Sequence, residues 1–221
     1  MLALDSSGNG YDGVNQGGPE IGLPGLRGTA YSFDEPGSWI QVPSEPALNP
    51  YHKDFLVSAW VKVRDAPKGK RTADIIRKGL SFSTGGVYKL ELIADGYIKC
   101  SAKDAENATG RVIGSEITLT DGKWHHIGCA RTGSTWSAIV DETVTSQTVD
   151  LGSIHNTMPV SIGSKYGLED LPKGRVDEVS LTVSEKKVAT QARRLLFGPR
   201  EMIDSLDAEP PTGLWRLDEL E

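Results

Sequence analysis

The sequence predicts an all-β protein in which two antiparallel sheets pack face to face as a sandwich. Three observations predict it. The 25 glycines and 12 prolines are spread along all 221 residues and divide the chain into short segments. About a dozen of these segments carry apolar and β-branched residues between turn residues. A helical spacing of apolar residues occurs in one place only, residues 184–197.

The expected strands follow one another at short, turn-bounded intervals. The longest, residues 55–63, is apolar at almost every position, which is typical of a central strand buried on both faces. The others are residues 31–33, 39–42, 73–77, 87–93, 97–102, 116–119, 124–131, 135–140, 144–149, 160–162, 175–183 and 213–218. So many short strands need a second sheet to cover their apolar faces, which favours a sandwich.

One short helix is expected near the C-terminus, over residues 184–197. Ser184 and the charged residues after it form its N-terminal cap, and Gly198-Pro199 ends it. Its apolar face consists of Val188, Ala192, Leu195 and Leu196. Residues 209–211, Glu-Pro-Pro, then predict a stiff linker before the final strand.

Charge and hydropathy exclude two classes of partner. The net charge is −6 and the Lys and Arg residues do not cluster, so a nucleic-acid partner is not expected. No apolar stretch approaches the ~18 residues of a membrane span, so membrane insertion is not expected either. The first residues lack the basic start and apolar centre of a signal peptide. Either the chain is cytoplasmic or its export signal lies outside this sequence, and the second interpretation is favoured by the cysteines discussed below.

Five segments in a fixed order carry a family resemblance. They are residues 5–13 (DSSGNGYDG), 32–40, 55–61, 121–126 (DGKWHH) and 174–179 (GRVDEV). Together they resemble the laminin-G-like jelly-roll domain of the concanavalin A-like lectin/glucanase superfamily. The resemblance implies a single antiparallel jelly-roll domain over residues 1–221. Because fold alone does not give function, it leaves open a glycan binder, an adhesion module, a hydrolase or a spacer.

The C-terminus departs from the family pattern. Similar domains open with a strand that resembles Leu-Trp-Arg-Leu-Asp-Glu, and here these residues stand at the other end, within residues 213–219. Three explanations are open. The strand folds back in cis in a permuted domain, the chain is one period of a tandem array, or the strand is donated in trans to a neighbouring copy. In each case it fills a sheet edge that would otherwise be unpaired.

A structural calcium ion is the expected cofactor. Residues 5–13 form a glycine-rich turn with short oxygen-bearing side chains, which hard cations prefer. The resemblance implies a Ca2+ site made by Asp5, Asn9, the backbone around Gly37, and Asp177. The alternative is a metal-free turn held by its own side-chain hydrogen bonds.

The resemblance also implies a disulfide between Cys100 and Cys129, since related modules carry cysteines at these two places. The alternative is two buried free thiols. A disulfide favours an oxidising compartment, so an extracellular or cell-surface location is expected.

No enzymatic activity is expected. The superfamily's retaining glycosidases carry carboxylates on alternate positions of one strand, and no expected strand of this chain has that pattern. Nor is there a Gly-x-Ser-x-Gly nucleophile sequence. His125 and His126 face opposite sides of their strand, so they cannot bind one metal together.

A glycan site would combine exposed aromatic rings with polar side chains that bond to hydroxyl groups. The residues assigned to it are Trp60, Arg77, Tyr88 and Trp136, with Tyr166 as a further ring and Lys78, Lys89 and Glu91 as further polar residues. We therefore expect a non-catalytic, extracellular module that binds carbohydrate or a glycosylated surface. The alternative is a structural spacer or a self-assembling repeat that exchanges its C-terminal strand.

Overall fold

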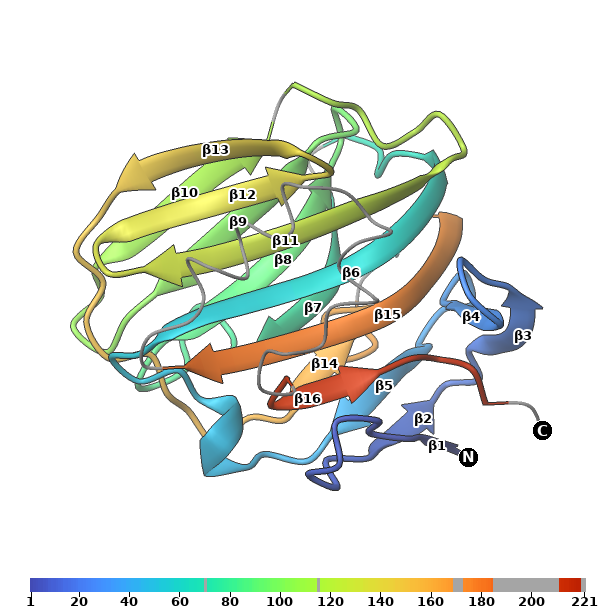
Figure 1. Ribbon diagram of the computed structural model, residues 1–221, viewed down its shortest axis with the longest axis horizontal. Helices are drawn as coiled ribbons and strands as arrows, with labels where there is room; N and C mark the ends of the chain where they lie inside the picture. The colour runs from blue at the N-terminus through green and yellow to red at the C-terminus, as the bar shows by residue number, and fades with distance from the viewer. Residues whose placement is uncertain (70, 115, 169–172, 185–210, 220–221) are drawn as a thin grey trace.

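The computed structural model describes residues 1–69, 71–114, 116–168, 173–184 and 211–219. They form two stacked antiparallel sheets (Figure 1). We call the sheet at the back of this view the first sheet and the one at the front the second sheet. The expected two-sheet, all-β fold is confirmed; the expected helix over residues 184–197 lies outside the described residues, apart from Ser184.

The first sheet has eight strands in the spatial order β1-β2-β5-β14-β7-β8-β9-β10. Their bounds are β1 Leu2–Ala3, β2 Gly13–Gln16, β5 Trp39–Val42, β14 Val160–Ile162, β7 Thr72–Lys78, β8 Val87–Ile93, β9 Ile98–Lys103 and β10 Thr109–Gly114. The second sheet has the order β13-β12-β11-β6-β15-β4-β3, with β16 paired to β15. Its strands are β13 Thr143–Thr148, β12 Thr135–Val140, β11 Trp124–Thr132, β6 Asp54–Asp65, β15 Lys173–Ser184, β4 Thr29–Ser32, β3 Glu20–Pro24 and β16 Gly213–Trp215. A short 3-10 turn, Pro46–Leu48, precedes β6.

The core lies between the two sheets, where alternate residues of each strand point inward. An aromatic cluster fills its middle: the Phe55 ring lies 5.3 Å from that of Tyr88 and 5.7 Å from that of Trp136. All three side chains are fully buried.

The predicted disulfide is confirmed. Cys100 on β9 and Cys129 on β11 are bonded and so join the two sheets through the core, with a sequence separation of 29. Trp136 covers the bridge region and donates its indole N–H to the carbonyl oxygen of Cys100 at 3.1 Å.

Most expected strands coincide with observed ones to within a few residues, but residues 116–119 are not a strand. β10 was missed because two of its three inward positions hold glycine. A Cβ on Gly110 would lie 3.1 Å from the Trp136 ring, and one on Gly114 would lie 3.0 Å from Ile98. The neighbours fill the space that an apolar side chain would otherwise take, so the sequence shows no apolar alternation there.

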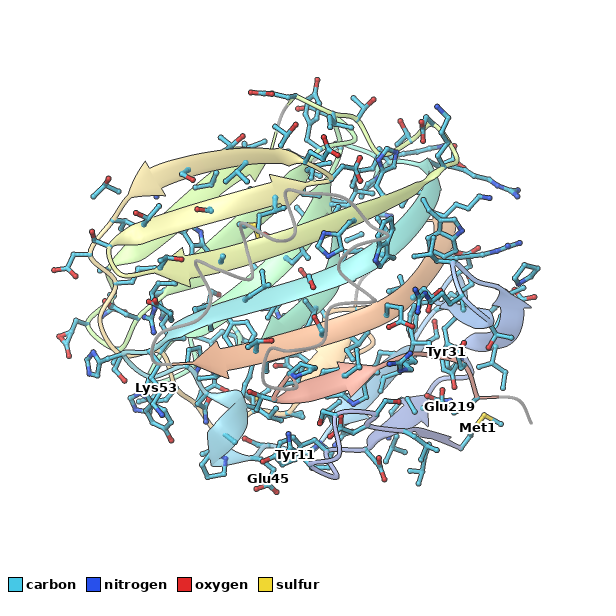
Figure 2. The ribbon with its side chains drawn as sticks, viewed as in Figure 1. Met1, Tyr11, Tyr31, Glu45, Lys53 and Glu219 are labelled. Carbon is cyan, nitrogen blue, oxygen red and sulfur yellow. A yellow bond between two sulfur atoms is a disulfide. The ribbon has the colours of Figure 1, made fainter. Side chains whose placement is uncertain are left out.

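The C-terminal strand β16 lies beside β15 of the same chain, with Val179 opposite Trp215 (Figure 1). Glu219, just beyond it, accepts hydrogen bonds from the Leu4 amide at 2.8 Å and from the Tyr31 hydroxyl at 3.0 Å. Figure 2 shows the Tyr31 and Glu219 side chains together near the N-terminus. The two ends of the described chain therefore meet in one part of the fold. No described helix is long and apolar enough to cross a membrane.

Candidate functional site

The four residues assigned to ligand binding do not come together. Tyr88 and Trp136 are fully buried between the sheets, so their assignment as exposed rings is corrected: they are core residues. Trp60 lies on the outer face of the second sheet, 9% exposed, with its ring 5.3 Å from that of His126. Arg77 alone lies on the outer face of the first sheet.

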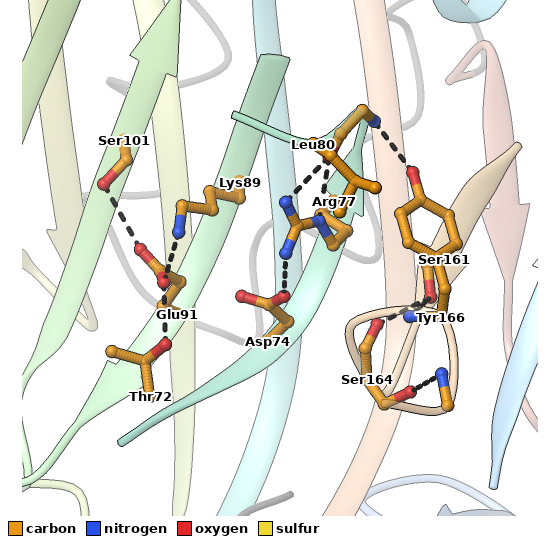
Figure 3. A network of polar contacts seen from close by, with 12 residues as sticks. Thr72, Asp74, Arg77, Leu80, Lys89, Glu91, Ser101, Ser161, Ser164 and Tyr166 are labelled. Carbon is orange, nitrogen blue, oxygen red and sulfur yellow. Dashed lines mark hydrogen bonds and ion pairs between the residues drawn. The ribbon is translucent and has the colours of Figure 1, made fainter. Parts of the chain in front are cut away.

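A polar network covers the outer face of the first sheet at its central strands β14, β7, β8 and β9 (Figure 3). These positions face away from the core because the alternate residues, such as Ile76, Leu90 and Cys100, point inward. The network, here called the outer polar network, consists of Thr72, Asp74, Arg77, Lys89, Glu91, Lys99, Ser101, Ser161, Ser164 and Tyr166. Of the further polar residues expected on this face, Lys89 and Glu91 belong to it, while Lys78 points inward and donates to the Met158 carbonyl oxygen at 2.6 Å.

Arg77 is the centre of one half of the network. Its guanidinium donates to Asp74 Oδ2 at 2.5 Å and to the Gly79 carbonyl oxygen at 3.0 and 2.8 Å. Asp74 and Arg77 are 4% and 3% exposed. Burial raises the pKa of Asp74, and the nearby charge of Glu91 adds to the rise against the opposing effect of Arg77. Asp74 Oδ1 is buried and has no hydrogen-bond partner among the described residues.

Glu91 is the centre of the other half. It lies directly opposite Asp74 on the neighbouring strand. Its Oε1 accepts from Lys89 at 2.6 Å and Thr72 at 2.9 Å, and its Oε2 is 3.0 Å from the Lys99 ammonium. Burial by itself would raise the pKa of Glu91, but the two lysines outweigh it and lower the pKa below its ordinary value.

One aromatic ring lies against Arg77, and a second ring packs on the first. The Arg77 guanidinium carbon lies 5.6 Å from the centre of the Tyr166 ring, and Trp39 meets the same ring edge-on at 5.5 Å. Tyr166 has a positive φ of 54°, an uncommon conformation for a residue with a side chain. The loop holds it there: the Ser161 hydroxyl donates to the Ser164 carbonyl oxygen at 2.6 Å, and the Tyr166 hydroxyl accepts from the Gly79 amide at 2.8 Å. Trp39 and Tyr166 are half-buried, so each exposes part of a ring beside the network.

This arrangement suits binding better than catalysis. Two carboxylates lie side by side, but Glu91 is fully buried and both of its oxygens are engaged by positive or hydroxyl groups. A nucleophile or general base needs access to substrate, which Glu91 lacks. The accessible groups are the partly exposed lysines, hydroxyls and rings, which form hydrogen bonds and stacking contacts.

Sequence reasoning missed Asp74 and Trp39 as members of this site. Asp74 lies one residue from a bulge in β7, where the register with β8 shifts between Asp74 and Ile76. A bulge changes the face on which a residue lies and leaves no sign in a simple alternation pattern. Trp39 is the first residue of an expected strand. Its contact with Tyr166 depends on the position of the loop after β14, which the sequence does not indicate.

Of the four residues expected to bind calcium, Asp5 and Asn9 lie in one turn, where both bond to the Ser7 hydroxyl, while Gly37 and Asp177 contact other residues. Asp5 accepts from the amides of Ser7, Tyr11 and Leu214 at 2.9 Å each, while Asn9 donates to the Thr212 carbonyl oxygen at 3.0 Å. The backbone of Gly37 lies against Gly17 and Gly167. Asp177 accepts from the Leu26 amide at 2.7 Å, and burial raises its pKa to about 7. Within the described ranges, no group of three or more His, Cys, Asp or Glu residues is placed to hold a metal ion.

On this geometry we expect calcium to leave the melting temperature of the protein unchanged. The Asp5 carboxylate already accepts several N–H donors, which a cation would have to displace. The measurement is thermal unfolding in millimolar CaCl2 and in EDTA. A ligand at 100 times its Kd stabilises by about 2.7 kcal/mol, or about 5 to 10 °C for a domain of this size. A rise of that size in CaCl2 would show that these residues rearrange around calcium.

A second prediction concerns the adjacent histidines of β11, whose pKa values move in opposite directions. His125 bonds to Asp141 at 2.7 Å and to Asp121 at 3.0 Å; the bond to Asp141 is the main cause that raises its pKa above 6.5. Burial lowers the pKa of His126 to about 4. The His125 contribution to stability is present below pH 6.5 and is lost as pH rises through its folded pKa. The His126 contribution is present above pH 6.5 and is lost as pH falls toward 4.

We therefore expect the contribution of this pair to the free energy of unfolding to be largest near pH 6.5. The measurement is chemical unfolding from pH 5 to 9. Above pH 6.5, the free energy of unfolding of His125→Gln should fall less steeply with pH than that of the wild type. The control, His52→Gln, changes an exposed loop histidine and should keep the wild-type profile. A His125→Gln profile parallel to wild type above pH 6.5 would refute the assignment.

Comparison with known families gives one match to most of the chain. Residues 34–188 match the Laminin_G_3 family, described as the Concanavalin A-like lectin/glucanases superfamily. No curated protein sequence matches the chain significantly.

Several solved structures share the fold. The binding domain of Paraclostridial Mosquitocidal Protein 1 has 16% identity and a TM-score of 0.68; the match covers 88% of this chain and 51% of that one. The receptor binding domain of botulinum neurotoxin C/D mosaic serotype has 14% identity and a TM-score of 0.65, with 87% and 48% covered. The binding domain of botulinum neurotoxin serotype D has 15% identity and a TM-score of 0.65, with the same coverage. This chain thus spans about half the length of these structures.

Proposed function

We propose that this chain, which belongs to the concanavalin A-like lectin/glucanases superfamily, is a non-catalytic module that binds carbohydrate or a glycosylated surface. The outer polar network, with Trp39 and Tyr166 beside it, is the proposed ligand face. The proposal places the protein outside the cell or on its surface. The Cys100–Cys129 disulfide is compatible with that location.

The observation that carries this proposal is the combination of ordered charges and half-exposed rings on one sheet face. Sugars present apolar ring faces and hydroxyl groups, so aromatic rings beside fixed donors and acceptors are the complementary surface. Lys89 and Lys99 keep part of their side chains accessible, 24% and 13%.

The solved structures with this fold support a binding role in a general way, since those named above are binding or receptor-binding domains. At 14% to 16% identity they share the fold, and ligand identity does not transfer. The full burial of Glu91 supports the non-catalytic part of the proposal.

The test is a glycan array screened with folded protein, followed by titration of the best ligand. We expect saturable binding that weakens about tenfold in Tyr166→Ala and in Lys89→Gln, the loss of about 1.4 kcal/mol typical of a residue important for binding. The matched control is Lys123→Gln, which changes an exposed lysine in the turn before β11 of the second sheet and should bind like wild type. Silence of the folded protein on the array would overturn the proposal, and release of cleaved sugar would overturn its non-catalytic part.

Assembly through the C-terminal strand is a second candidate function, favoured by the position of β16. Among the described strands, β16 pairs only with β15. A strand attached in this way can be supplied by another copy. The corresponding experiment is given with the Trp215 variant in the Discussion.

A further inference from the structure

A row of side chains crosses one end of the second sheet on its outer face. Lys62 of β6 lies directly opposite Trp124 of β11 on one side and Arg175 of β15 on the other. Their neighbours Val61, Val63 and Val176 point into the core, at 1%, 1% and 3% exposure, so the row points outward. All three members of the row are half-exposed.

The two cations of this row are placed where they repel each other. Like charges directly opposite on neighbouring strands destabilise a sheet. Among the described residues, Lys62 has no hydrogen bond or ion pair, and Arg175 makes one hydrogen bond, from Nη1 to the Pro24 carbonyl oxygen at 2.8 Å. Most of the donors of this pair are therefore free for a ligand.

The cations line a hollow of the surface. Its volume is about 380 Å³, and Arg64 lies in its wall beside Lys62 and Arg175. Its wall also contains Glu20, Asp34, Asp65, Ser32, Leu23 and Gly174. Asp34 accepts from the Gly174 amide at 3.3 Å, and none of the three carboxylates forms an ion pair with the cations in the described part of the chain.

We propose that Lys62 and Arg175, with Trp124 beside them, bind the anionic group of an acidic saccharide. A carboxylate or a sulfate ester between the two cations would cancel their repulsion and accept charge-assisted hydrogen bonds from both. The Trp124 ring, next in the row, is a surface for the apolar face of a sugar. The exposed Asp34 carboxylate in the wall of the hollow is an acceptor for its hydroxyl groups.

This site is independent of the proposed function. It lies on the outer face of the second sheet, whereas the outer polar network lies on the outer face of the first. The domain therefore has one proposed ligand site on each sheet, and either site can fail without the other.

The experiment is calorimetric titration of the whole protein with three probes: tri-galacturonate, a sulfated maltotriose and unmodified maltotriose. We expect binding of at least one anionic probe, none of the neutral one at this site, and a weaker affinity at higher salt. Lys62→Gln and Arg175→Gln should each weaken binding about tenfold, since each removes one charge-assisted contact. Arg111→Gln changes an exposed arginine of the first sheet that belongs to neither proposed site, and this variant should bind like wild type.

A stability readout separates this role from a structural one. If Lys62 is retained for a ligand, Lys62→Gln removes repulsion and should keep or raise the melting temperature while it lowers affinity. Preference for tri-galacturonate assigns the site to carboxylates and preference for the sulfated probe assigns it to sulfate esters. The proposal is overturned if neither anionic probe binds, or if Arg111→Gln weakens binding as much as Lys62→Gln. It is also overturned if a hexaglutamate peptide binds as tightly as the anionic saccharides and Trp124→Ala has no effect on their affinity.

Discussion

Replacing Cys100 and Cys129 together by alanine is expected to lower the free energy of unfolding by about 3 to 4 kcal/mol. The bond closes a loop with a sequence separation of 29 and so restricts the unfolded chain. It also joins β9 of the first sheet to β11 of the second, so its loss removes a direct cross-link between the two layers inside the core. The measurement is equilibrium unfolding in urea under oxidising conditions.

Reductant supplies the control. Wild-type protein in dithiothreitol should approach the stability of the double variant, and the variant itself should not respond to dithiothreitol. A double variant within 1 kcal/mol of oxidised wild type would contradict the expectation, since the smallest effect usual for a native disulfide of a small domain is about 2 kcal/mol.

The substitution Trp215→Ala is expected to cost about 3 to 5 kcal/mol, the range for large aromatic residues truncated in a core. The Trp215 side chain is fully buried and donates its indole N–H to the Tyr11 carbonyl oxygen at 2.9 Å. Its backbone lies beside Val179, and a bridge joins it to Asp5. One side chain thus fixes both the C-terminal strand and the N-terminal turn.

Leu214→Ala is the matched control, because Leu214 is half-exposed on the same strand and should cost less than about 1 kcal/mol. If Trp215→Ala unfolds the protein, a chain that lacks residues 212–221 is mixed with a synthetic peptide of those residues. Recovery of the native melting temperature on mixing shows that the strand acts in trans, which favours the assembly function. Equal stability of Trp215→Ala and wild type would contradict the role given to this strand.

The fold was largely predictable because its strands carry strong local signals. Residues 87–93, 135–140 and 160–162 were expected as strands, and β8, β12 and β14 have these bounds. β2 and β10 were missed for one physical reason. Their inward positions include Gly13, Gly110 and Gly114, whose space is taken by side chains of neighbouring strands. When a neighbouring strand supplies the apolar side chain at such a position, the sequence of the strand itself shows no apolar alternation.

The candidate site was only partly predictable, since its formation depends on register. Arg77, Lys89, Glu91 and Tyr166 were expected near one another, and the structure brings them to one face. Tyr88 and Trp136 are aromatic, as Trp39 is, but they lie on the inward face of their strands. When both faces of a strand are partly apolar, the sequence does not show which residues point inward. The Trp124–Lys62–Arg175 row likewise depends on pairing among three strands that are distant in sequence.

The claim that the outer polar network holds the ligand is tested most directly by mapping amide NMR shifts during titration with the best glycan from the array. The expected result is saturable change confined to β7, β8, β14 and the loop that carries Tyr166, with the second sheet unaffected. Saturable change confined to the second sheet, or to the turn at Asp5, would contradict it and place the glycan elsewhere on the domain.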